Sequence, residues 1–124
     1  MADVFELTIQ LKRNGVSVAN FPLTRRFSAD EAQSFLYEQA NQGAGTFAAI
    51  PLEQLGTING LVVTPDQQVT IRLDGQTDAG IVLNQGGVLL ILDATIDAGA
   101  GSSNASLNNV SGSTATIQGI GLGT

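Results

Sequence analysis

The chain contains no cysteine, no histidine and no tryptophan among its 124 residues. The lack of cysteine excludes disulfides, thiolate nucleophiles and zinc–thiolate sites. The lack of histidine removes the usual general base and the commonest ligand of transition metals. We therefore expect a protein that is not an enzyme and that holds no metal and no cofactor.

Positive charge is scarce. Only Lys12, Arg13, Arg25, Arg26 and Arg72 are basic, against 11 acidic residues, so the formal net charge is −6. Binding to nucleic acid depends on a basic surface that displaces counterions from the phosphates, and this composition does not supply one. We expect no nucleic-acid partner.

Long hydrophobic runs are also missing. The most hydrophobic stretch, Gly86 to Leu92, is far shorter than the roughly 20 residues needed to span a bilayer. The N-terminus has neither a basic region nor the apolar run of an export signal. We expect no membrane association, and a product that stays in the cytoplasm unless a partner carries it elsewhere.

What the chain does contain is material for β-structure. From Ala79 to Thr124 the only charged residues are Asp93 and Asp97, and most of the rest is Val, Ile, Leu, Ala, Gly, Ser, Thr and Asn. A chain of 124 residues with 43% apolar content is long enough to bury a core without covalent cross-links. We predict one domain over residues 1–124.

The clearest pattern lies near the N-terminus. Residues alternate between apolar and polar from Phe5 to Lys12, which predicts a half-buried strand, and Asn14-Gly15 is typical of a tight hairpin turn. A second strand from Val16 to about Phe27 places Arg13 opposite Val16 but leaves Ile9 opposite Asn20. One extra residue near Ala19-Asn20 corrects this mismatch and places Phe21 and Leu23 on the core face, so we predict a β-bulge there.

Residues 28–42 admit two interpretations. Ser28-Ala-Asp-Glu31 resembles the capping box of a helix, which leaves open a short helix near residues 29–40. The alternation of Phe35, Tyr37 and Gln39 with polar and small residues, and the strands expected on both sides, favour a strand instead.

Short apolar runs separated by turn residues continue to the C-terminus. We expect strands in the ranges 46–52, 60–64, 68–74, 81–83, 88–96, 106–110 and 114–122. Five consecutive apolar residues make 88–96 the most buried strand by composition, and the last two strands are predicted to form a hairpin across Ser111-Gly-Ser113. This spacing indicates an all-β fold, a single antiparallel β-sandwich or jelly roll.

No pattern of acidic residues predicts a site. Asp74 with Asp78, and Asp93 with Asp97, offer oxygen ligands, but the further ligands and closing glutamate of a calcium loop do not follow. Turns explain these aspartates better.

Six residues are candidates for contacts with other subunits. Gly119, Gly121 and Gly123 resemble a phosphate loop, but the chain ends one residue later and no helix follows. Alternate glycines instead permit close approach of another backbone, so we expect this strand to be an edge for self-association. Among the aromatic residues, Phe21, Phe35 and Tyr37 are the candidate anchors, in the core or at an interface.

The strand-and-turn pattern over residues 27–118 resembles a class of small virion proteins of tailed phages. The segments that carry this resemblance are Phe27 to Gln39, Ala49 to Leu52, Leu55 to Thr57, Leu61 to Val63, Gln68 to Leu73, Ile81 to Leu90 and Asn109 to Ala115. Proteins of this class are single β-sandwich or jelly-roll domains that decorate capsids or belong to tail and fibre assemblies.

The resemblance implies a structural subunit of the virion, assembled in the host cytoplasm. A capsid decoration (cement) protein or a related head or tail subunit is the leading expectation, with the major capsid protein as a partner and a homo-oligomer, such as a trimer, as its form. The alternative is a receptor- or glycan-binding sandwich, in which loops such as Gly99 to Asn104 meet a sugar.

Overall fold

The computed structural model describes residues 2–73, 80–94 and 105–124, and these residues form strands, turns and loops without a helix. The strands are β1 (Asp3–Ile9), β2 (Lys12–Arg13), β3 (Val16–Ser17), β4 (Leu23–Ala29), β5 (Glu31–Gln39), β6 (Ala48–Ala49), β7 (Ile58–Pro65), β8 (Val69–Arg72), β9 (Ile81–Leu83), β10 (Leu89–Ile91), β11 (Ser106–Asn108) and β12 (Ala115–Gly123). All pairings between them are antiparallel.

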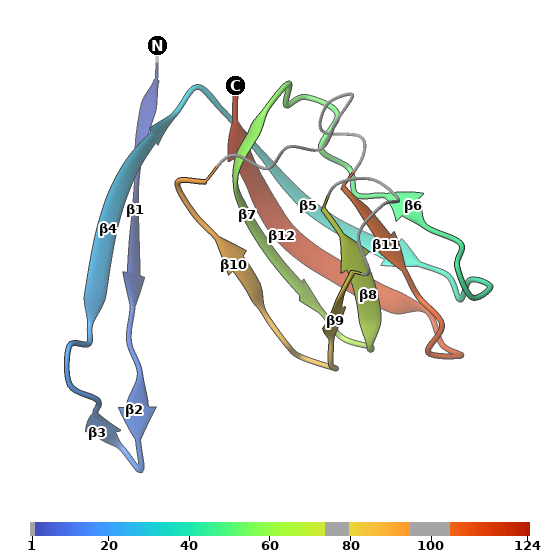
Figure 1. Cartoon of the computed structure of the whole chain (residues 1–124), viewed down its shortest axis with the longest axis horizontal. Coiled ribbons are helices and arrows are strands. Elements are labelled where there is room, and N and C mark those ends of the chain that lie inside the picture. The colour runs from blue at the N-terminus through green and yellow to red at the C-terminus, as the bar shows by residue number, and fades with distance from the viewer. Residues whose placement is uncertain (1, 74–79, 95–104) are drawn as a thin grey trace.

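Two four-stranded sheets form the body of the molecule (Figure 1). The long sheet has the order β10-β7-β12-β5, and the short sheet has the order β6-β11-β8-β9. Their facing side chains form one apolar core, with Leu61, Val63 and Ile117 from the long sheet and Ile71 and Leu107 from the short sheet. The predicted all-β antiparallel sandwich is confirmed, whereas the strand order does not establish a jelly roll.

Strand β5 (Glu31–Gln39) occupies most of residues 29–40, as the alternation favours, and the alternative helix does not form. Phe35 points into the core and is 7% exposed, while Leu36 points outward and is 69% exposed. Burial of every second side chain is the pattern of a strand, because a helix would place successive side chains around its axis.

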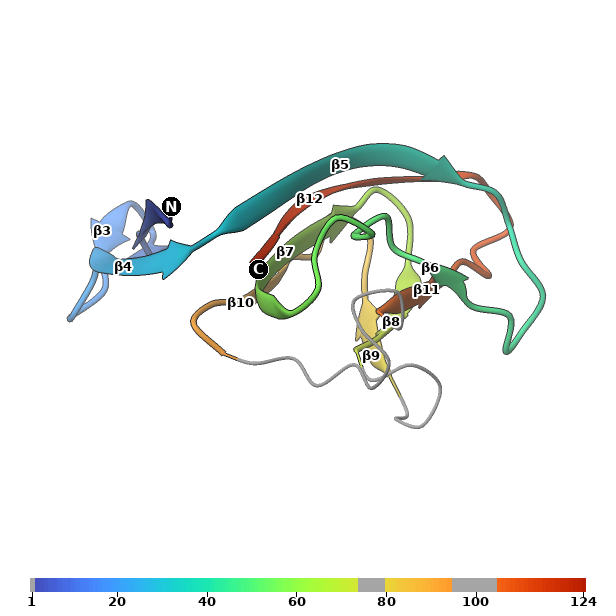
Figure 2. The same ribbon diagram turned by 90° about the horizontal axis from the view of Figure 1, so that it is seen from above.

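Strands β1 to β4 form an arm, residues 2–29, that stands to one side of the sandwich in both views (Figures 1 and 2). β1 pairs with β4, and β2 pairs with β3 beyond them. The predicted turn at Asn14-Gly15 closes the tip, with φ of 51° and 83°. Both residue types tolerate this left-handed backbone, which matches the twist of a hairpin.

The arm is interrupted where the bulge was predicted, but the interruption is larger. Leu11 accepts a hydrogen bond from Val18, and Ile9 pairs with Leu23, so the four residues from Ala19 to Pro22 stand opposite Gln10 alone. Asn20 adopts a φ of 70° there. The predicted one-residue bulge is therefore wrong in size, and Phe21 lies half-buried in this loop instead of facing Ile9.

β12 lies in the middle of the long sheet, paired with β5 on one side and β7 on the other. The expectation that this strand is an edge is therefore wrong. A side chain at Gly119 would meet the Val62 carbonyl oxygen, and its Cβ would lie 2.7 Å from Cζ of Phe35. The absence of side chains at these glycines leaves room for residues of the chain's own core.

The predicted hairpin across Ser111-Gly-Ser113 is also wrong, since β11 belongs to the short sheet and β12 to the long sheet. The connection is held by Asn109, whose side chain is fully buried. Its Nδ2 donates to the carbonyl oxygens of Gln39 and Ser113, both at 2.8 Å, and its Oδ1 accepts from Ser111. A satisfied buried amide of this kind fixes the crossing between sheets.

The strand expected to be most buried is an edge strand in its described part. β10 pairs only with β7 among the described strands. Val88 is 62% exposed and Leu90 is 37% exposed, because both face outward. A run of apolar residues does not by itself distinguish a buried strand from one with an uncovered apolar face.

The glycines of β12 yield a first prediction. Gly119→Ala should destabilise the protein by about 3 kcal/mol or more, because neither the Val62 carbonyl nor the Phe35 ring can move without disturbing the sheet. Gly43→Ala is the control, since its Cβ would have a nearest neighbour at 3.6 Å in an exposed loop. Urea unfolding should separate the two variants, and equal midpoints would contradict the packing role.

Candidate interaction surface

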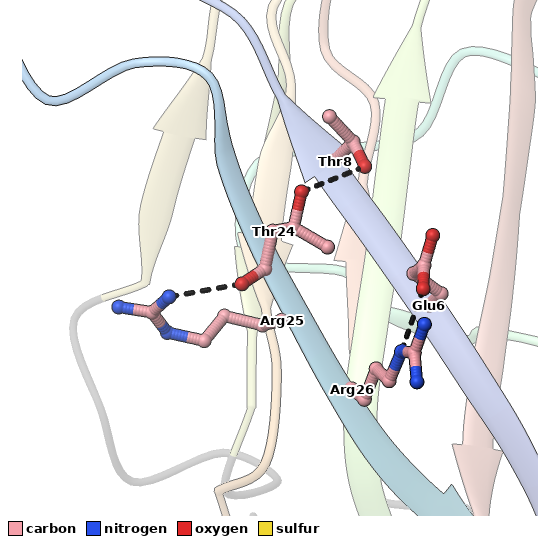
Figure 3. Close-up of polar contacts among 5 residues, drawn as sticks. All are labelled: Glu6, Thr8, Thr24, Arg25 and Arg26. Carbon is pink, nitrogen blue, oxygen red and sulfur yellow. Dashed lines mark hydrogen bonds and ion pairs between the residues drawn. The ribbon is translucent and has the colours of Figure 1, made fainter.

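The arm has one polar and one apolar face because side chains alternate along both of its long strands. On the polar face, Glu6 pairs with Arg26, and their side chains form an ion pair with Oε2 and Nε 2.7 Å apart (Figure 3). The hydroxyl groups of Thr8 and Thr24 lie 3.1 Å apart on the same face. These exposed contacts hold the register of the hairpin and add little stability.

On the apolar face, the same register brings large side chains together. Phe5 pairs with Phe27, their rings stacked with centroids 5.8 Å apart, and Ile9 pairs with Leu23. Leu7 lies between them, opposite Arg25, whose guanidinium turns to donate a hydrogen bond to the carbonyl oxygen of Thr24 (Figure 3). The result is a continuous apolar strip along the arm.

Only the base of this strip is buried against the sandwich. Phe27 and Ala29, 9% and 4% exposed, form a cluster with Leu122 of β12, against which Phe5 and Leu92 also pack. At the same point the amide of Asp30 donates to the carbonyl oxygen of Gly123 over 2.9 Å. The arm is thus fixed at its base, while Leu7, Ile9 and Leu23 further out remain half-exposed.

A small hollow of about 290 Å³ lies where the arm meets the sandwich. Arg25, Arg26 and Phe27 line it from the arm, and Leu92 and Asp93 from the sandwich. Asp93 is exposed and has a φ of 51°, as expected for a turn residue. The hollow therefore contains charges of both signs.

The tip of the arm is cationic. Lys12 and Arg13 are both exposed beside the turn. Arg72, the one basic residue after the arm, is occupied differently, since its guanidinium carbon lies 4.0 Å from the centre of the Phe47 ring. This stacking on an aromatic face leaves the arm as the cationic surface of the described chain.

The structure does not bring the predicted contact residues to one surface. Phe35 and Gly119 pack together inside the sandwich, Gly121 lies against Leu52 and Leu55, and Gly123 lies against Thr57. Each of these residues therefore has a role within the chain, and their part in contacts between subunits stays a prediction. Phe21 differs from these residues because it lies on the arm and not inside the sandwich.

Tyr37 lies on the inner side of β5, half-buried, with its ring at an angle to Phe35 and 6.1 Å away. Its hydroxyl group is buried and has no hydrogen-bond partner among the described residues. Loss of solvent around the phenol raises the pKa of Tyr37 to about 12. This position makes Tyr37 a core residue.

Several residues considered above lie outside the described ranges. These are Asp74, Asp78 and Asp97, and the loop from Gly99 to Asn104. Within the described ranges, no group of three or more acidic residues is placed to hold a metal ion. No helix in those ranges has the length and apolar character to cross a membrane.

The residues that form this surface were not identified as a site from the sequence. The arm uses Leu7, Ile9, Leu11 and the two cations at its tip, and the alternation of these residues by itself predicts only a hairpin that packs on the core. One available signal was the position of the basic residues, four of which precede residue 27 in an otherwise acidic chain.

The base of the arm yields a second prediction. Phe27→Ala should detach the arm, because it removes the ring that joins Phe5 to Leu122. Trypsin reports this directly, since four of the five basic residues lie on the arm. We expect cleavage there to accelerate about tenfold or more, whereas Val4→Ala, on the exposed face, should leave the rate unchanged. Equal rates for both variants would contradict an anchored arm.

The buried phenol yields a third prediction. Because the folded protein holds the Tyr37 proton more tightly than the unfolded chain, the free energy of unfolding should fall as pH rises from about 10 to about 12. Tyr37 is the sole tyrosine, so its ultraviolet titration should show the raised midpoint in the folded protein and an ordinary one in denaturant. Tyr37→Phe should remove this pH dependence without loss of stability at neutral pH.

Comparison of the chain with protein-family models, with curated proteins and with solved structures found no match.

Proposed function

We propose that this protein is a non-enzymatic structural subunit that acts through contacts with other proteins. The observation that carries this proposal is the arm, an antiparallel hairpin whose apolar face is covered by the sandwich only at its base, where Phe27 and Ala29 are buried and Phe5 packs beside them. A two-stranded ribbon is marginally stable alone in water, and an apolar strip left half-exposed gains stability when a partner covers it.

The resemblance of residues 27–118 to small virion proteins of tailed phages directs the proposal further. On that basis the protein is a capsid decoration protein or a related head or tail subunit, with the major capsid protein among its partners. The sandwich serves as the rigid part, and the arm increases the area of contact with neighbouring subunits. Such contacts suit a subunit added to a shell, because area and shape complementarity need no reacting group.

The alternative of a glycan-binding module has less support. Sugar sites commonly use an exposed aromatic ring as a platform. Among the aromatic residues, Phe27 and Phe35 are buried, Phe5 is stacked on Phe27, Phe47 is stacked under Arg72, and Tyr37 belongs to the core, which leaves only the half-buried Phe21 of the arm. No observation in the described ranges favours a glycan over a protein partner.

The proposal is tested by co-sedimentation with capsids of the phage whose genome encodes the chain. We expect saturable binding of the purified protein. Leu11→Asp should reduce the bound amount about tenfold or more, because it places a charge on the 49%-exposed apolar end of the arm. Val4→Asp is the matched control, since Val4 is 70% exposed on the opposite face.

Failure of the unmodified protein to bind these capsids, together with its retention on a glycan array, would contradict the proposal. Binding that is the same for both aspartate variants would preserve a virion role but exclude the arm as the contact.

A further inference from the structure

The apolar strip of the arm has a counterpart on the sandwich. The outer face of the long sheet carries Leu90, Val62 and Ile120 side by side, since Leu90 pairs with Val62 and Val62 with Ile120. Leu36 lies on the same face of β5, diagonal to Ile120 because it pairs with Gln118, and is 69% exposed. We call these four residues the outer patch. It begins where the base of the arm ends, because Ile120 also packs against the base cluster.

The far end of the same face is hollowed and acidic. A depression of about 460 Å³ is lined by Thr64, Asp66, Thr116 and Gln118, among others. Thr116 pairs with Glu38 of β5, and its amide donates to Oδ1 of Asp66 over 2.7 Å. Glu38 and Asp66 are both exposed, so two carboxylates stand beside the depression.

The charges of the arm and of the rest of the chain are complementary. Residues 1–29 contain four basic and two acidic residues, a formal charge of +2. Residues 30–124 contain one basic and nine acidic residues, a formal charge of −8. Opposite charges on two surfaces of one chain attract when those surfaces belong to different copies, and they steer the copies into one orientation.

The spacing of residues along the arm also matches the spacing of residues along β12. Ile9 and Arg13 are four residues apart on the arm, as are Ile120 and Thr116 on β12. At about 3.4 Å per residue, an arm laid along β12 with Ile9 over Ile120 places Arg13 at Thr116, next to Glu38 and Asp66. Aligned packing of two β-layers permits this arrangement.

We propose that the arm of one copy docks on the outer face of the long sheet of a second copy. The apolar strip covers the outer patch, and Arg13, which follows Ile9 and Leu11 on the same face of the arm, meets Glu38 and Asp66. This deepens the proposed function by naming the partner of the arm. A copy's own arm is fixed at the opposite end of β12 by Phe27 and Leu122, and it stands clear of the sandwich beyond that point (Figure 2).

The test measures the mass of the isolated protein by sedimentation and light scattering across the micromolar range. The unmodified chain should associate. Arg13→Glu and Glu38→Arg should each raise the dissociation constant about tenfold or more, because each places like charges in contact. Glu53→Arg is the control for Glu38→Arg, since it makes the same change of charge on an exposed loop residue away from the outer face.

Mixing the two weakened variants gives the decisive measurement. The Glu38→Arg variant keeps an unmodified arm, and that arm can dock on the unmodified sheet of the Arg13→Glu variant. The reversed arm and the reversed sheet also carry opposite charges, so the mixture should associate as tightly as the unmodified chain. Circular dichroism checks that both variants are folded, and Lys12→Glu, on the opposite face of the same strand, is the matched control for Arg13→Glu. A monomeric unmodified chain, or association that these charge reversals leave unchanged, would overturn the proposal.

The proposal is also wrong if the arm folds onto the sheet of its own chain. In that case the mixture of the two variants fails to associate, whereas a single chain with both Arg13→Glu and Glu38→Arg behaves as the unmodified protein. Capsid binding by a chain that does not self-associate would reject this inference and leave the proposed function standing.

Discussion

The close packing around β12 is the constraint on which the rest of the structure depends. This strand pairs on both sides, and its inner face has glycine at positions 119, 121 and 123. Without side chains there, Phe35 and the leucines at 52 and 55 reach the sheet directly. The outer face of the same strand carries Ile120 and Leu122, which support the arm. One strand therefore fixes both the core and the position of the arm.

The arm and the sandwich differ in how they are stabilised. The sandwich has a core of fully buried apolar side chains and a satisfied buried amide at Asn109. The arm beyond its base has cross-strand pairs, one exposed ion pair and half-exposed apolar side chains. Each cross-strand pair or exposed ion pair of the arm contributes only roughly 0.2–1 kcal/mol to the free energy of unfolding. A hairpin of this composition gains order when another surface covers its apolar face.

Part of the fold could be predicted from the residue types and their order along the chain. Alternation predicted a strand from Phe5 to Lys12, which the structure divides into β1 and β2 with a break at residues 10–11, and it favoured a strand within residues 28–42, where β5 lies. The Asn14-Gly15 turn follows from the φ values that those residues tolerate. Strand partners were not predictable in the same way, because pairing joins distant segments. Ser111-Gly-Ser113 reads as a hairpin turn locally, yet the buried Asn109 redirects the chain to the other sheet. The glycines of β12 suggested close approach, but not that the approaching groups were the chain's own.

The candidate surface was harder to predict, since an amphipathic strand has the same pattern whether its apolar face meets its own core or a partner. The edge of the long sheet shows the distinction. β5 is unpaired along one side among the described strands, and it carries Glu31 and Glu38, charges that oppose pairing with another edge. These charges discourage association through the β5 edge, while apolar side chains are left uncovered on the arm and on the outer face of the long sheet.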